Sequence, residues 1–464
     1  MKNLLLFVAI SLLLISETIS AQTPQIKGTI AVSTQNGTLQ GDVTISNLPR
    51  VENYVILLNK GLNIEFLRNE DKKFNYYFDS NYDEEVSEEG FQYFIPNDDR
   101  TGKFLPKELR IKYTGAFPVI NNYSEAYEWG DWKGNIAFRG NTLRASEQSV
   151  WYPVLYDVAN DRIINKYTYD LTIKTELGNS IYLNGSAPTS KNEATLTSSF
   201  PVSLLLFAGE FSFSAKEGIY IVNGKLDAEK EQTLSIWTNT IIDFYEKKLE
   251  IDYGQTVTYL GAHPTSIKNG WMFVTYPTIA IIGNDRWSFA GYFDEKTHEW
   301  IDESNTSFIA HELGHYYFGT RFIPNDTLRW AFLEGMTEYI SLQAVREILG
   351  DETYQKKLQS YAENSNDLEV IGLHDITQFR EINETYRYNY FPLLINALET
   401  EIGEKAVWNW CKVIIRSKNQ NSNYQFFKDT LLECGVSGEE FKNFELKYIT
   451  SKDAKKNVMS LVSE

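Results

Sequence analysis

Two of the five histidines in this 464-residue chain lie four positions apart, in the stretch FIAHELGHYYFG. Side chains at positions i and i+4 project from the same face of a helix, so His311 and His315 can offer two imidazole nitrogens to one metal ion. Glu312 lies beside them, where its carboxylate would reach a water molecule on that metal rather than the metal itself. This HExxH pattern is typical of zinc hydrolases, in which the glutamate is the general base. We therefore predict a helix here that binds Zn²⁺.

A catalytic zinc site has three protein ligands and one open position, so a third ligand should follow. Pro324 is expected to end the first helix, and Asp326 or Thr327 to cap a second helix over residues 328–349. Glu334 lies near the start of that helix, with 18 residues between it and the second histidine. The alternative is a solvated helix carboxylate, but large apolar residues flank Glu334, and a buried carboxylate needs a partner. We predict that Glu334 is the third ligand.

Glu338 follows Glu334 by one helical turn and shares its face. Histidines that bind a metal usually donate their second N–H to a carboxylate, which orients the ring. We predict that Glu338 supports one of the two histidines in this way. The alternative is a salt bridge from Glu338 to Arg346 or to a lysine elsewhere in the chain.

The elements that must position these residues fall into two parts. From Ile26 to about Phe213 the chain alternates apolar and polar residues in short runs, and Asn36-Gly37 turns one predicted hairpin. Helical spacing of apolar residues begins at 227–250 and dominates from Asn305 onward. We predict an α+β multidomain protein, with an antiparallel β domain over 22–224 and a mixed, helix-rich domain over 225–464.

The first 21 residues resemble a secretory signal peptide of the bacterial type. A lysine at position 2 precedes the apolar run Leu4–Ile15, and small residues before Gln22 suggest cleavage after Ala21. Twelve helical residues rise only about 18 Å, too little to cross the roughly 30 Å core of a bilayer. We therefore expect a protein exported to the periplasm or the medium, with no membrane span in the mature chain.

The formal net charge of −18 argues against nucleic acid as a partner, because a phosphate backbone is bound through Lys and Arg.

Cys411 and Cys434 are the only two cysteines, so the chain has no disulfide framework. Export would permit one bridge between them, and two free thiols are equally compatible with the sequence. The sequence gives no indication of an oligomeric state.

The zinc segment resembles the gluzincin aminopeptidases of the membrane alanyl aminopeptidase type. The resemblance rests on HELGH, the 18-residue spacing and the EG of LEGMTEY, and HYYFGT is similar to that family's HQWFGN. LRIKYTG, LLFAGEF and IDFYEKKLEIDYG match other segments of the family in the same order. The resemblance implies a thermolysin-like catalytic domain, one Zn²⁺ per chain and a peptide or protein substrate. It also implies a short member without the family's C-terminal helical-repeat domain.

The family places a tyrosine about 60 residues beyond the third ligand, where its hydroxyl stabilises the oxyanion. The stretch YNYFPLLINALETEIG aligns with that segment on Gly403 and places the tyrosine at Tyr388. The residues that follow the tyrosine differ from the family pattern, and Tyr386 and Tyr390 are close alternatives. The resemblance therefore implies a catalytic role for one of these three, with Tyr388 preferred.

One feature of the family is missing. Its members carry a Gly-x-Met-Glu-Asn strand whose glutamate pairs with the free α-amine of the substrate, and the sequence around 281–293 lacks it. Asp285 is the nearest carboxylate that could replace this glutamate, and Arg286 beside it could neutralise Asp285. We expect a zinc metallopeptidase, with aminopeptidase activity preferred because of the overall resemblance. The alternatives are an endopeptidase, another peptide-end specificity, and an inactive binding or scaffold protein.

Overall fold

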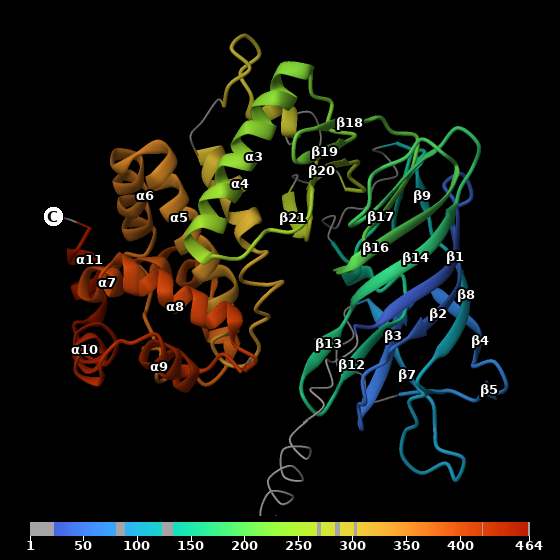
Figure 1. Cartoon of the computed structure of the whole chain (residues 1–464), viewed down its shortest axis with the longest axis horizontal. Coiled ribbons are helices and arrows are strands. Elements are labelled where there is room, and N and C mark those ends of the chain that lie inside the picture. The colour runs from blue at the N-terminus through green and yellow to red at the C-terminus, as the bar shows by residue number, and fades with distance from the viewer. Residues whose placement is uncertain are drawn as a thin grey trace, which may run out of the picture.

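The computed structural model describes residues 23–79, 89–122, 133–266, 271–283, 288–300, 304–419 and 421–462. The predicted signal peptide and Asp285 lie outside these ranges. Most of the β sheets lie on one side of the molecule and the helices on the other (Figure 1). This α+β arrangement, with β sheets first and helices last, confirms the predicted fold class. None of the described helices is both long and apolar enough to span a membrane.

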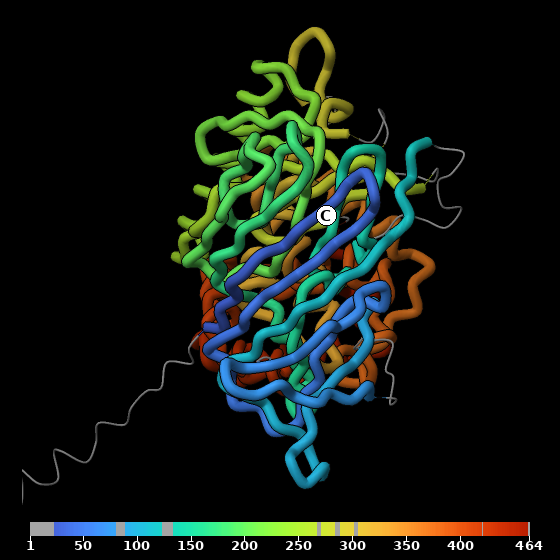
Figure 2. The backbone as a smooth tube through the Cα atoms, turned by 90° about the vertical axis from the view of Figure 1, so that its right-hand side faces the viewer, coloured from blue at the N-terminus to red at the C-terminus, as the bar shows by residue number. Residues whose placement is uncertain are grey.

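The described residues from 23 to 209 build three sheets. The largest forms the outer face of the molecule, where its long strands run side by side (Figure 2). In sheet order its strands are β16 (Glu193–Ser203), β14 (Lys166–Lys174), β1 (Gln25–Ser33), β2 (Thr38–Ser46), β8 (Leu109–Ala116), β4 (Leu62–Arg68) and β5 (Lys73–Phe74). The predicted hairpin is confirmed as β1–β2, whereas β1 pairs with β14 in parallel.

Two smaller sheets complete this β region. One consists of β15 (Ser180–Leu183), β17 (Leu206–Gly209), β11 (Thr142–Ala145), β10 (Ala137–Arg139) and β9 (Val119–Ile120). The other consists of β13 (Arg162–Ile164), β12 (Val154–Asp157), β3 (Tyr54–Asn59), β7 (Gly90–Phe94) and β6 (Tyr77–Phe78). Every residue of β3 and β17 is buried, so these strands show no alternation of apolar and polar residues.

A fourth sheet stands between the β region and the helices. Its order is β18 (Phe213–Lys216), β19 (Ile219–Val222), β20 (Val257–Ala262), β22 (Thr278–Ile282) and β21 (Trp271–Thr275). β19 pairs with β20 in parallel, so the sheet joins strands from both sides of the boundary expected at residue 224. Among the described strands, β21 lies at the edge of this sheet and pairs only with β22.

The helical part begins with α3, which the spacing of apolar residues predicted. Asp227 caps α3 through hydrogen bonds from the backbone N–H groups of Glu229 and Lys230. The helices are α3 (Ala228–Leu249), α4 (Ser304–Gly314), α5 (Met336–Leu349), α6 (Asp351–Asn364), α7 (Phe391–Ile402), α8 (Glu404–Arg416), α9 (Tyr424–Glu433), α10 (Gly438–Phe444) and α11 (Ala454–Ser460). Cys411 and Cys434 are free thiols.

Most buried apolar residues of the β region and of the helices form one continuous core, and a smaller second cluster lies among β17, β20 and β22. The helix α4 is part of this core, where both α3 and α5 pack against it. The Tyr245 hydroxyl of α3 donates to the Ala310 carbonyl of α4 at 2.8 Å. Gly314 allows the close approach of α5, since a Cβ there would lie 3.0 Å from Thr337 Cγ2. Packing on both sides therefore fixes the helix that carries the HExxH pattern.

Candidate metal centre

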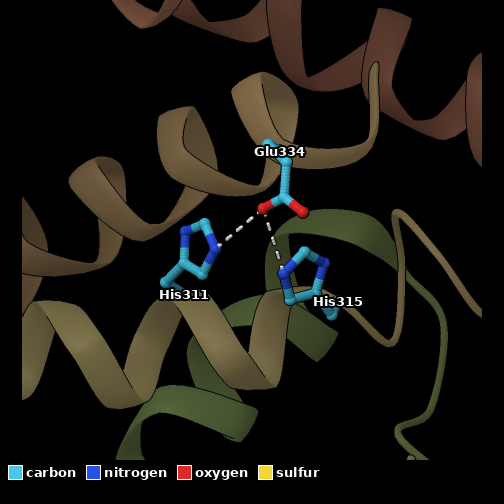
Figure 3. A group of neighbouring side chains, drawn as sticks. All are labelled: His311, His315 and Glu334. Carbon is cyan, nitrogen blue, oxygen red and sulfur yellow. Dashed lines mark ion pairs between the residues drawn. The ribbon is translucent and has the colours of Figure 1, made fainter. Parts of the chain in front are cut away.

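The two histidines of α4 and Glu334 converge on one point (Figure 3). Glu334 Oε2 lies 3.3 Å from His311 Nε2 and 3.4 Å from His315 Nε2. All three side chains are largely buried, with 12–13% of their surface exposed. The structure thus brings together the three residues that the sequence predicted as zinc ligands.

Each histidine has a hydrogen-bond acceptor behind its second nitrogen. His311 Nδ1 lies 2.6 Å from Glu338 Oε2, and His315 Nδ1 lies 3.2 Å from the Phe318 carbonyl oxygen. These acceptors hold the ring proton on Nδ1 and leave the lone pair of each Nε2 facing Glu334. The two lone pairs and the carboxylate oxygen would repel one another unless a proton or a cation lies between them.

Two further observations fit a divalent cation at this point. Glu334 Oε2 is buried and accepts no hydrogen bond of good geometry from the described residues, so a metal would satisfy it. Burial alone would lower the pKa of His311, but the carboxylates of Glu334 and Glu338 hold that pKa well above its usual value. Nitrogen and carboxylate donors in this number are those of a catalytic zinc site. The residues present therefore fit Zn²⁺.

Glu338 lies where the sequence placed it, against His311. The Tyr361 hydroxyl of α6 donates to its other carboxylate oxygen, and nothing in the sequence pointed to this tyrosine. Arg346, the alternative partner for Glu338, instead pairs with Asp351 at 2.8 Å and with Glu399 at 3.3 Å.

The helix that carries Glu334 differs from the predicted one. The segment Ala331–Gly335 forms a π-helical turn, and the regular helix α5 begins only at Met336. A second π-helical turn, Tyr386–Tyr390, precedes α7 and packs on the first. π-helical turns are often found at functional sites. Glu334 and Tyr388 each lie within one of them, and the hydrophobic spacing gave no indication of either turn.

A cleft of about 430 Å³ opens beside these residues. Its lining includes Lys133, Glu147, Gln148 and Lys166 of the β region, Met272 to Tyr276 of β21 and the turn after it, and His311, Glu312, His315, Glu334 and Tyr388 of the helical part. None of these cleft residues from the β region or from β21 was predicted from the sequence. Residues 281–283, at the start of the segment compared with the family's amine-binding strand, do not line the cleft.

Glu312 lies in the cleft beside the candidate metal ligands and is 8% exposed. Burial raises the pKa of Glu312, while the neighbouring imidazoles of His311 and His315 act in the opposite direction. A raised pKa brings a carboxylate nearer to the range in which it can take up and release a proton near neutral pH.

Of the three alternative tyrosines, only Tyr388 lines the cleft. Its ring centroid lies 5.9 Å from that of His311, and its pKa is raised by burial and by the charge of Glu334. Its hydroxyl therefore stays protonated at neutral pH and can donate a hydrogen bond. Tyr386 and Tyr390 are 1% exposed and line a different pocket, where the Tyr386 hydroxyl donates to the Ile371 carbonyl.

The chain is similar to solved structures but not to known protein families at the level of sequence. No protein-family profile and no curated protein match the sequence. Among solved structures, the chain is similar to leukotriene A4 hydrolase from Saccharomyces cerevisiae, with a TM-score of 0.64 and 16% identity over 91% of this chain and 67% of that one. The bestatin complex of the yeast LTA4 hydrolase gives a TM-score of 0.63 and 17% identity over 90% of this chain and 65% of that one.

An M1 zinc metallopeptidase from Deinococcus radiodurans is similar over most of both chains. The TM-score is 0.61 and the identity 14%, over 92% of this chain and 93% of that one. A structure of the same bacterial peptidase with a Tyr-Ser-Ala substrate gives a TM-score of 0.56. The protein therefore has the fold of the M1 zinc metallopeptidases.

Proposed function

We propose that this protein is an exported, zinc-dependent metallopeptidase that hydrolyses peptide bonds. The observation that supports the proposal best is the convergence of two imidazole nitrogens and one carboxylate oxygen beside a buried glutamate and a tyrosine in one cleft. His311, His315 and Glu334 would hold the metal. An inactive scaffold protein would not need a general base and an oxyanion donor beside these ligands, so this arrangement favours an enzyme.

When bound, Zn²⁺ would lower the pKa of a water molecule toward neutrality and polarise the scissile carbonyl. Glu312 takes the proton from the attacking water and then passes it to the nitrogen of the leaving amine. The Tyr388 hydroxyl donates a hydrogen bond to the oxygen that becomes negatively charged. Glu338 and the Phe318 carbonyl keep both imidazoles oriented with Nε2 toward the metal.

The proposal is tested by the variant Glu312→Gln, which keeps the size of the side chain but removes its ability to accept a proton. We expect this variant to bind one zinc per chain and to lose about 10²-fold or more in kcat on peptides. Zinc content by elemental analysis and peptide hydrolysis by mass spectrometry are measured on the same preparation. Hydrolysis at the wild-type rate would exclude Glu312 as the base, and zinc-loaded wild-type protein that cleaves no peptide would favour the scaffold alternative.

Export is part of the proposal and rests on the apolar segment Leu4–Ile15. Expression of the full chain in a Gram-negative host tests it. We expect the protein in the periplasmic fraction or the medium, with Gln22 as the first residue found by amino-terminal sequencing. Full-length protein that stays in the cytosol would contradict this part of the proposal.

A further inference from the structure

The cleft wall contributed by the β region carries one carboxylate, that of Glu147. Among the described residues that line the cleft, only Glu147, Glu312 and Glu334 are acidic. The last two have roles in the proposed chemistry. Glu147 is therefore the remaining described carboxylate of the cleft that could pair with the α-ammonium group of a peptide. Whether its charge is free or already paired within the protein determines which peptides the cleft accepts.

Both oxygens of Glu147 already have partners within the protein. Oε1 forms an ion pair with Lys133 Nζ, and Oε2 accepts a hydrogen bond from the Thr275 hydroxyl at 2.7 Å. The side chains of Lys133 and Glu147 are 13% and 12% exposed. An ion pair as buried as this one is screened little by solvent and is costly to break.

Lys133 is held in place by further contacts. Its ammonium group donates to the Val274 carbonyl of β21 at 2.7 Å and lies 5.3 Å from the ring centroid of Phe273. The Ser146 hydroxyl donates to the Lys133 carbonyl oxygen at 2.5 Å, so the backbone of Lys133 is fixed beside the turn that carries Glu147. The ammonium group is thus anchored between Glu147 of the β region and the edge strand β21.

Lys133 lines the same cleft as Glu312 and the candidate metal ligands, so a substrate bound there lies close to the Lys133–Glu147 pair. A peptide with a free α-ammonium group would have to displace Lys133 from Glu147 or lie beside it, and like charges so close repel. An amide or an acetylated amine carries no charge and meets neither obstacle. The ion pair therefore disfavours a free amino terminus in this cleft.

We propose that Lys133 is a specificity-determining residue, an internal counter-ion of Glu147 that makes peptide hydrolysis independent of a free α-amine. The substrates are then peptides whose amino end is blocked or extends beyond the cleft, so that an uncharged amide meets the Lys133–Glu147 pair. This inference rests on the proposed peptidase activity, and it replaces the aminopeptidase specificity that the sequence resemblance favoured.

The test compares two peptides that differ only in acetylation of the amino terminus, using zinc-loaded full-length protein. We expect the wild-type kcat/KM to be at least as high for the acetylated peptide. Lys133→Met frees Glu147, so the preference should shift toward the free amine by about 10- to 100-fold, the scale of a charge-assisted hydrogen bond. The double variant Lys133→Met/Glu147→Gln should lose that shift.

Lys166→Met is the matched control, because Lys166 lines the same cleft and the charge of Glu147 acts on it, but no described carboxylate forms a close ion pair with it. The comparison is made at pH 6, below the Lys166 pKa of about 7, so that the variant removes a charge. Loss of that charge without release of Glu147 should change the preference by about threefold or less. A shift as large as that of Lys133→Met would attribute the effect to general charge and overturn the inference.

Mass spectrometry of longer peptides separates the two kinds of substrate. Cleavage of short acetylated peptides near their end supports a blocked amine, and internal fragments with intact ends support an extended chain. Stepwise loss of amino-terminal residues by the wild-type protein, with acetylated peptides spared, would overturn the inference and leave the proposed peptidase in place.

A binding measurement tests the role of Lys133 separately from the proposed peptidase activity. It requires neither the Lys133→Met variant nor substrate turnover. Calorimetry on the Glu312→Gln protein should show that the acetylated peptide binds at least as tightly as the free one. Tighter binding of the free peptide by about tenfold or more would overturn the inference, even if no protein hydrolyses either peptide. Absence of hydrolysis in every protein would refute the proposed function alone.

Discussion

At the scale of single residues, the candidate site consists of metal-ligand side chains whose orientation is fixed by hydrogen bonds to their other polar atoms. Glu338 orients His311, and Tyr361 in turn donates to Glu338. Supporting groups of this kind determine which nitrogen faces the metal, and their loss often costs 10- to 100-fold in metal affinity or activity. Single substitutions that remove the Glu334 carboxylate or the Tyr388 hydroxyl test the contribution of each group.

Removal of the Glu334 carboxylate tests the third ligand. Glu334→Ala leaves two imidazoles, so we expect a loss of zinc affinity on the order of 10²-fold or more. Elemental analysis after dialysis against a weak chelator measures the retained zinc. Glu347→Ala is the control, since Glu347 is an exposed glutamate on the same helix, α5. Full zinc occupancy in Glu334→Ala would remove this residue from the site.

Removal of the Tyr388 hydroxyl tests the oxyanion donor. Tyr388→Phe should lower kcat by about 10²- to 10³-fold with little change in KM, because the hydroxyl acts on charge that develops in the transition state. Tyr386→Phe and Tyr390→Phe remove hydroxyls that lie outside the cleft, and both should keep kcat within a few fold. A kcat defect confined to one of these two would reassign the role to that residue.

At the scale of elements, the site depends on the contact between the two π-helical turns that carry Glu334 and Tyr388. Gly335 lies at this contact. A Cβ there would lie 2.4 Å from Phe391 Cδ1 and 3.1 Å from the Arg387 carbonyl oxygen. Phe391 is fully buried and has little room to move away. The two turns can approach this closely only because position 335 carries no side chain.

Gly335→Ala should therefore force the two turns apart. We expect a loss of about 1–3 kcal/mol in the free energy of unfolding, together with a lower kcat as Tyr388 moves away from the candidate metal centre. Urea denaturation and steady-state kinetics measure the two effects. Gly438→Ala, in α10, meets no atom within 4 Å and should leave both quantities unchanged or slightly raise stability. Equal behaviour of the two variants would show that the contact tolerates a methyl group.

At the scale of the whole molecule, the β region and the helical part share one core, and Lys166 of β14 crosses between them. Lys166 Nζ donates to the Thr320 carbonyl at 2.8 Å, in the loop that follows α4, the helix that carries the two candidate histidine ligands. Burial lowers the pKa of Lys166 to about 7, the charge of Glu147 acts in the opposite direction, and Arg321 lowers the pKa further. In the unfolded chain the pKa is near its ordinary value of 10.5.

The sign of the pH dependence follows from these two values. Between pH 7 and 10.5 the unfolded chain holds a proton on Lys166 that the folded protein does not, so stability rises with pH across this window. Below pH 7 both states are protonated, and the cost of the buried charge is present in full. Lys166→Met removes that cost. We expect the variant to exceed the wild type in Tm by on the order of 2–4 °C at pH 6, and by less at pH 9.5.

Thermal melts at the two pH values measure this difference. Lys174→Met is the control on the same strand, because Lys174 is half-exposed and pairs with Glu193. Its effect on Tm should be equal at both pH values. A Lys166→Met protein less stable than the wild type at pH 6 would show that the hydrogen bond to Thr320 outweighs the buried charge.

Sequence alone determined the parts of this protein that depend on local geometry. The spacing of His311 and His315 places two imidazoles on one helical face wherever the helix lies, because the helical repeat is fixed. A separation of 18 residues lets a helix–turn–helix bring Glu334 back to them. The β1–β2 hairpin and the span of α3 were predictable for the same reason, since turn residues and apolar periodicity act within a few residues.

Only the tertiary structure decided what surrounds that centre. Glu147 and Thr275 are 128 positions apart and are joined by a hydrogen bond, and Lys133 pairs with Glu147 and donates to Val274 beside Thr275. No local pattern specifies such a contact, because it depends on how a β region and an edge strand pack together. The π-helical turns arise in the same way, from packing that overrides local helical preference. The sequence thus indicated the candidate metal ligands, and the folded chain determined which charges lie beside them in the cleft.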